Sequence, residues 1–102
     1  MVNQPTWLVN PCGVASPPRY QLAPRPSGSP RAVLGGTVLG LLDNGKTNAG
    51  IILDEIGAAL QQQYGFAEVI HIRKPGVAHP CPEALLNDLR ARCTVVVNGV
   101  GD

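Results

Sequence analysis

The sequence predicts an α/β fold in which a three-stranded parallel sheet follows a Pro-rich extended arm. Residues 32–102 alternate between short apolar segments and segments with helical periodicity. The order strand–helix–strand–helix–strand requires parallel strands joined by right-handed crossovers. Residues 1–31 contain seven of the ten prolines, and proline fixes φ and lacks a donor N–H, so we expect neither helix nor inner strand there. We therefore divide the chain into an N-terminal arm (residues 1–31) and an α/β domain (residues 32–102).

Length and composition indicate one small domain with the amino-acid composition of an ordinary soluble protein. The chain has 102 residues, of which 44% are hydrophobic and 15% charged, with a formal net charge of +1. No Lys/Arg cluster marks a nucleic-acid partner, and the apolar runs are shorter than the ~20 residues of a membrane helix. The start lacks the features of a signal peptide, so we expect a cytoplasmic location. Three cysteines without metal-type spacing predict neither a disulfide framework nor a metal site.

The N-terminal arm carries two of the four aromatic residues, Trp7 and Tyr20. Large amphipathic rings tend to anchor contacts, so we expect the arm to wrap around its own domain or a partner. The alternative to such a wrapping arm is a flexible tail without fixed contacts, which composition alone would favour.

The first half of the domain reads as strand, turn and helix. Residues 37–42 form the predicted strand, residues 43–48 the turn and residues 49–64 the helix. Asn48 or Thr47 is placed to cap the helix start, and Gly65 to end it. The i, i+4, i+7, i+8 spacing predicts that the helix buries one face, which consists of Ile52, Ile56, Ala59, Leu60 and Gln63.

The second half repeats this alternation. Residues 68–73 are predicted to form a second strand, and residues 94–97 a third. Between them, Pro82 is predicted to begin a helix that runs to about Arg92. Parallel sheets are normally covered on both faces, and a three-stranded one leaves an exposed edge. We therefore expect half of a doubly wound, flavodoxin-like sheet that a partner chain completes.

Two turns follow strand ends and form the candidate site. In the flavodoxin-like order the first and third strands are neighbours, so the first turn (residues 43–48) and the second turn (residues 98–102) should face each other. The first turn also opens a helix, whose free N–H groups favour an anion. The candidate catalytic residues are Lys46 and Asp43. The candidate substrate-binding residues are Asn44, Gly45, Thr47, Asn48, Asn98, Gly99, Gly101 and Asp102. Ordinary turn and cap chemistry is the alternative explanation for the same residues.

Other polar residues are weaker candidates. Arg73 and Lys74 lie just past the second strand, where they either attract anions or are merely solvated. His71 lies between Ile70 and Ile72, and we expect a packed or edge-exposed histidine rather than a catalytic one. Cys93 begins the third strand and is expected to behave as a small hydrophobe.

Residues 40–47 match the phosphate-loop pattern G-x-x-x-x-G-K-[ST]. Leu41 and Leu42 continue the apolar strand through the supposed loop, which leaves only residues 43–47 for the turn. A nucleotide-binding module therefore stays an alternative function. A non-catalytic interaction subunit, which would bind through the N-terminal arm, is another.

Three separated segments carry a family resemblance. They read VLGLLDNGKTN (residues 38–48), IRKP (72–75) and VVVNGVGD (95–102). This resembles the UGSC family of proteins and selenoproteins, in which the pattern GLLDNxKxN … RKP … VVxGxGD leads into Cys- or Sec-Gly-Ser-Cys. The resemblance covers roughly residues 20–102.

The resemblance implies a function for the two turns. The chain would be the small subunit or N-terminal fragment of a heteromeric α/β enzyme that uses thiol or selenol chemistry on a small, anionic substrate. A second polypeptide with the Cys/Sec-Gly-Ser-Cys segment would supply the nucleophile, and Lys46 would help to keep it ionised. A separate gene, cleavage, or a UGA codon read as stop would each explain an end at Asp102. No particular cofactor is predicted.

Overall fold

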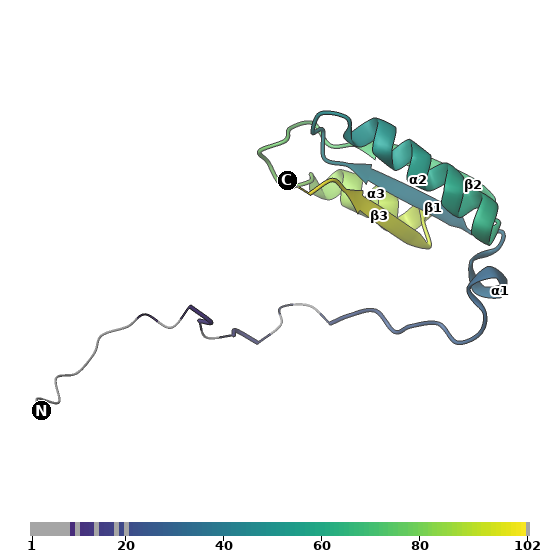
Figure 1. Cartoon of the computed structure of the whole chain (residues 1–102), viewed down its shortest axis with the longest axis horizontal. Helices are drawn as coiled ribbons and strands as arrows, with labels where there is room; N and C mark the ends of the chain where they lie inside the picture. Colours follow the sequence, from purple (N-terminus) through teal and green to yellow (C-terminus); the bar gives the residue numbers. More distant parts are fainter. Residues whose placement is uncertain (1–8, 10, 14, 18, 20, 102) are drawn as a thin grey trace, which may run out of the picture.

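The computed structural model describes residues 9, 11–13, 15–17, 19 and 21–101. Figure 1 shows an α/β domain preceded by α1 and by the described part of the arm. The elements are α1 (Pro30–Leu34), β1 (Val38–Asp43), α2 (Ala49–Tyr64), β2 (Glu68–Arg73), α3 (Glu83–Arg92) and β3 (Val95–Gly99). The sheet is parallel throughout, with strand order β2-β1-β3. The α/β fold and the neighbouring first and third strands are thus confirmed.

Helices α2 and α3 cover opposite faces of the sheet (Figure 1). The side chains of successive β1 residues point to opposite faces of the sheet. Helix α2 packs against the residues on one face, and α3 against those on the other. A Cβ at Gly57 of α2 would lie 2.8 Å from Leu41 Cδ1, whereas a Cβ at Gly40 would lie 2.8 Å from the Sγ of Cys93, just after α3. The main core cluster lies on the α2 face, where Leu39, Leu41, Leu53 and Phe66 are buried, and Leu89 of α3 is buried on the other face.

The buried face of α2 differs from the predicted one. Leu53 is 1% exposed and Gly57 is buried, whereas Ile52 and Ile56 are 44% and 38% exposed. The prediction was therefore wrong for Ile52 and Ile56, and also for Ala59 and Gln63, which are exposed; of the predicted face only Leu60 packs against the core. The physical reason is close approach: Ala49, Leu53 and Gly57 form a row with small residues at both ends, which lets the helix axis come near β1.

The helix ends confirm one predicted cap and correct another. Gly65 ends α2 in the left-handed region with φ 72°, and its N–H donates to Gln61 O. Asn48 precedes α2 with φ 66° and makes no side-chain capping bond, so its predicted capping role was wrong. Pro82 lies one residue before α3, and its carbonyl accepts from the N–H groups of Leu85 and Leu86.

Helix α1 was not expected, because it begins at Pro30 inside the arm. Proline is tolerated there because the first helical N–H has no partner within the helix. Ser29 precedes it and accepts the Ala32 N–H at 3.3 Å. Arg31 then ties α1 to the end of α2, since its side chain donates to Gln63 O at 2.7 Å.

The arm residues 21–29 are exposed, and Figure 1 shows them turning back from α1 and running below the domain. Arg25, Pro26 and Gly28 border a hollow together with Val95 of β3. The predicted anchors Trp7 and Tyr20 lie outside the described residues. None of the described helices combines the length and the apolar character that crossing a bilayer requires.

Candidate functional site

The two turns meet at the carboxyl edge of the sheet, as the strand order predicts. Asp43, the last residue of β1, pairs with Arg73 of β2 and Gly99 of β3. Asn44 then ties the turns together: its N–H donates to Gly99 O at 2.9 Å and its side-chain amide to Val100 O at 2.6 Å. Both turns are shorter than predicted, because Asp43, Asn98 and Gly99 belong to strands. Backbone pairing continues to these residues, so they remain sheet rather than turn.

Two hollows open at this edge. The first is about 360 Å³, and both turns contribute to its walls: it is lined by Gly45, Lys46, Thr47, Val77, Val100 and Gly101. The second is about 320 Å³ and lies against the start of α2, where it is lined by Asp43, Gly45, Lys46, Thr47, Asn48, Gly50, Ile51 and Arg73. The first turn therefore lines both hollows.

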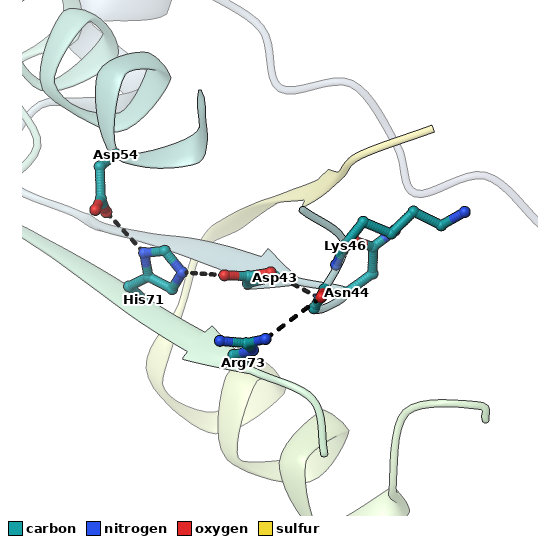
Figure 2. Close-up of polar contacts among 7 residues, drawn as sticks. Asp43, Asn44, Lys46, Asp54, His71 and Arg73 are labelled. Carbon is teal, nitrogen blue, oxygen red and sulfur yellow. Dashed lines mark hydrogen bonds and ion pairs between the residues drawn. The ribbon is translucent and has the colours of Figure 1, made fainter. Parts of the chain in front are cut away.

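A cluster of three ionisable side chains, which we call the Asp–His–Asp cluster (Asp43, His71, Asp54), adjoins the first turn (Figure 2). His71 of β2 pairs with Leu41, which places its ring on the α2 face beside Asp43. Its Nε2 lies 2.9 Å from Asp43 Oδ2, and its Nδ1 lies 2.7 Å from Asp54 Oδ1 of α2. The expectation of a merely packed or edge-exposed histidine missed these two contacts.

The cluster shifts the pKa values of two of its members. The hydrogen bonds to Asp43 and then Asp54 raise the pKa of His71 above its usual 6.5, against the opposing effect of burial. For Asp43, burial raises the pKa, but hydrogen bonds from His71 and the Gly45 N–H and the charges of His71 and Arg73 outweigh it, so the net pKa lies below 3.8. The cluster therefore favours the charged form of both groups.

Asp43 uses both carboxylate oxygens inside the protein. Oδ2 binds His71, and Oδ1 accepts the Gly45 N–H at 2.7 Å. Its side chain is only 6% exposed. The predicted catalytic residue Asp43 thus holds the first turn in shape, and Gly45, with φ 82°, is the glycine that this turn requires.

Two cations border the hollows. Lys46 donates its backbone N–H to Asn44 Oδ1 at 3.2 Å, and Figure 2 shows its side chain pointing away from the Asp–His–Asp cluster. Arg73 lines the second hollow, and its guanidinium reaches Gly45 O at 3.4 Å. Lys74, in contrast, donates to the carbonyls of Val77 and His79 and so holds its own loop.

Some predicted site residues lie elsewhere. Asn98 pairs with Leu42, so its side chain is on the opposite face of the sheet from Asp43. Asp102 lies outside the described residues. Cys93 lies against β1, and burial raises the pKa of its thiol, in keeping with its predicted role as a small hydrophobe.

Sequence reasoning missed Val77 and Asp54 altogether. Val77 reaches the first hollow from the loop after β2, and Asp54 reaches His71 from the second turn of α2. A signal for Asp54 existed in hindsight: an acidic residue six positions after the turn, on the side of α2 that faces β2.

The described residues contain no group of three or more His, Cys, Asp or Glu side chains that would hold a metal ion. The Asp–His–Asp cluster does not converge on one point, because its two carboxylates bind different nitrogens of the ring. The phosphate-loop pattern also lacks its geometry, since residues 40–43 lie within β1.

Fold and site together define an α/β protein with a polar site at the carboxyl edge of a parallel sheet. The chain belongs to the UGSC family, whose model matches residues 7–102. No curated protein and no solved structure matches the chain.

Proposed function

We propose that this chain is one part of a heteromeric, cytoplasmic enzyme that performs thiol or selenol chemistry on a small, anionic substrate. The chain supplies the groups that bind and orient the substrate. A second polypeptide supplies the nucleophile on a Cys/Sec-Gly-Ser-Cys segment. The thiol or selenol chemistry is what the family resemblance implies, and the geometry of the strand-end turns supports the division of roles.

The observation that carries this proposal is the first hollow. Its walls combine Lys46 and Thr47 of the first turn with Val100 and Gly101 of the second. Ligands of open α/β sheets bind outside the carboxyl ends of the strands, at the switch point where the strand order reverses. This hollow occupies that position between β1 and β3, and its volume suits a small molecule.

The chemistry of the lining supports an anionic substrate. The first turn leads directly into α2, whose first N–H groups carry partial positive charge. Lys46 adds a full positive charge in the first hollow, and Arg73 adds another in the neighbouring second hollow. Thr47 offers a hydroxyl, which both donates and accepts hydrogen bonds.

The second turn marks where the nucleophile would enter. In the family pattern the segment VVxGxGD leads into Cys- or Sec-Gly-Ser-Cys, and here Val100 and Gly101 of that segment line the first hollow. A thiol delivered beside Gly101 would share the hollow with Lys46. Because a nearby cation favours the thiolate, Lys46 would activate it.

Exposed apolar side chains support a second polypeptide. Ile51 and Ile52 of α2 are 66% and 44% exposed, and Val96 on strand β3 is 43% exposed. Val96 lies on the α3 face of β3, which pairs with β1 only, and an unpaired strand edge is typical of a surface that another element covers.

The test is alkylation of the assembled enzyme. Iodoacetamide reacts with the thiolate, so its rate at pH 7 reports the ionisation of the nucleophile. We expect Lys46→Ala to slow modification of the Cys/Sec-Gly-Ser-Cys segment about tenfold, which corresponds to roughly one pKa unit. Cys81, an intermediate-exposure thiol on the same chain, serves as an internal reference.

Arg90→Ala is the matched control, because it removes the same charge from α3, away from both hollows. It should leave the alkylation rate unchanged. An equal rate in Lys46→Ala and the unmodified complex would contradict the role given to Lys46.

A further inference from the structure

We propose that His71 is a positioning residue: doubly protonated between Asp43 and Asp54, it orders the first turn that lines both hollows. The inference goes beyond the proposed function in its mechanism, and rests on that function only for the anionic nature of the ligand.

The protonation state follows from the hydrogen-bond partners. An ionised carboxylate only accepts hydrogen bonds, and a neutral imidazole has only one N–H to donate. His71 faces a carboxylate oxygen at each ring nitrogen, at 2.9 Å and 2.7 Å. Both bonds form together only when both ring nitrogens carry a proton. The raised pKa of His71 agrees with this state.

His71 reaches the first turn through Asp43. One carboxylate oxygen of Asp43 binds the imidazolium and the other accepts the Gly45 N–H. Gly45 lines both hollows, so a fixed Asp43 carboxylate fixes the backbone on which a ligand would rest. Gly50 leaves room for the contact: a Cβ there would lie 3.1 Å from Asp43 Oδ2 and 3.7 Å from the His71 ring.

The charges around His71 come from three elements. Asp43 belongs to β1 and is 6% exposed, Asp54 belongs to α2 and is 68% exposed, and Arg73 lies two residues further along β2. With a charged ring the Asp–His–Asp cluster carries one negative charge. Loss of the ring proton doubles that charge and removes a hydrogen bond to a carboxylate. Both effects act against an anion bound at the first turn.

The primary experiment is NMR of the ¹⁵N-labelled 102-residue chain. Ring ¹⁵N shifts distinguish an imidazolium from either neutral tautomer. We expect both nitrogens of His71 to be protonated at pH 7, and the Gly45 amide resonance to move with the midpoint of the ring when the pH is raised. A neutral ring at pH 7, or a Gly45 amide that ignores the titration of His71, would overturn the proposal.

Three variants test the assignment further. Asp54→Asn removes one carboxylate at an exposed position and should lower the His71 midpoint. Glu55→Gln removes a neighbouring charge that does not contact the ring and should leave that midpoint in place. Equal midpoints in both variants would contradict the role of Asp54. His71→Gln should abolish the pH response of the Gly45 amide.

Sulfate binding separates this inference from the proposed function, because sulfate does not titrate between pH 5 and 9. We expect its affinity for the chain to fall several-fold above the His71 midpoint, and to be independent of pH in His71→Gln. Sulfate that binds without pH dependence would refute the positioning role alone. Sulfate that fails to bind at every pH would refute the anion site, while the NMR titration still decides the state of His71.

Discussion

Asp43 is the residue on which the site geometry depends. Its carboxylate is buried, and each oxygen has a different partner, His71 on one side and the Gly45 N–H on the other. Buried polar groups that keep all their hydrogen bonds rigidify their surroundings, and loss of one partner leaves the other unsatisfied. Asp54, at the other end of the same imidazole, is 68% exposed and can exchange its bond for water.

We predict that Asp43→Asn destabilises the domain more than Asp54→Asn does. An asparagine at position 43 offers only one acceptor, so either the His71 or the Gly45 donor is left without one, which costs about 1–3 kcal/mol. The exposed pair at Asp54 contributes roughly 0–1 kcal/mol. Urea denaturation of both variants measures the difference in the free energy of unfolding. Equal losses would show that burial does not set the importance of these carboxylates.

The Asp–His–Asp cluster also predicts how stability depends on pH. The pKa of His71 is raised in the fold, so its contribution is complete below 6.5, the unfolded value, and is lost as pH rises through the folded pKa. The pKa of Asp43 is lowered, so its contribution is complete above 3.8 and is lost as pH falls through its folded pKa.

The contribution of these two groups to the free energy of unfolding should therefore be largest between pH 3.8 and 6.5. Urea midpoints measured across pH for the wild type and His71→Gln isolate it. The difference between the two proteins should shrink above the folded pKa of His71. A difference that grows with pH would mean that the ring is neutral in the fold.

The polar residues that follow the predicted strands showed where the site lies, but they did not reveal its hydrogen bonds. Asn44, Gly45 and Lys46 were predicted site residues because they follow an apolar strand. Gly45 and Lys46 do line both hollows, whereas Asn44 ties the two turns together. The role of His71 depends on its pairing with Leu41 in the next strand. That register is set by tertiary packing, and nothing in the residues next to His71 encodes it.

Helix α2 shows how an element can be predicted in extent and misjudged in orientation. Its bounds were predicted correctly, since Gly65 marks the end and the helical run begins after Asn48. Apolar residues of all kinds occur around much of its circumference, so apolar spacing alone fits more than one face. Close approach to β1 selects the face with Ala49 and Gly57, because small residues there admit Leu41.

This orientation predicts a large contrast between adjacent residues. Leu53→Ala removes a fully buried side chain and should cost about 2–5 kcal/mol. Ile52→Ala removes a side chain that is 44% exposed, and should cost about 1 kcal/mol or less in the isolated chain. Thermal or urea unfolding of the two variants measures the contrast. Similar losses would place Ile52 in the core and contradict the orientation of α2.

Helix α3 and the strands followed local signals more closely. The ends of β1 and β3 lie one and two residues beyond the predicted ends, because hydrogen bonding between neighbouring strands extends into polar residues such as Asp43 and Asn98. Helix α1 escaped prediction because Pro30 marks a helix start as readily as an extended segment.

At the scale of the whole molecule, the sheet presents β3 at one side and β2 at the other, with β1 between them. The candidate site lies at the carboxyl ends of β1 and β3, and β3 is the strand that pairs on one side only. A polypeptide that packs there would reach the first hollow directly. In the function proposed above, the Cys/Sec-Gly-Ser-Cys segment would bring its nucleophile to the same point.

The most direct test of this arrangement is the intact mass of the complex purified under native conditions from the source organism. We predict the 10.7 kDa chain bound to a second chain that contains the Cys/Sec-Gly-Ser-Cys segment. One longer chain with both segments would keep the site but contradict the two-chain arrangement. A lone 10.7 kDa species without that segment would contradict the central claim, because the hollow would then have no nucleophile.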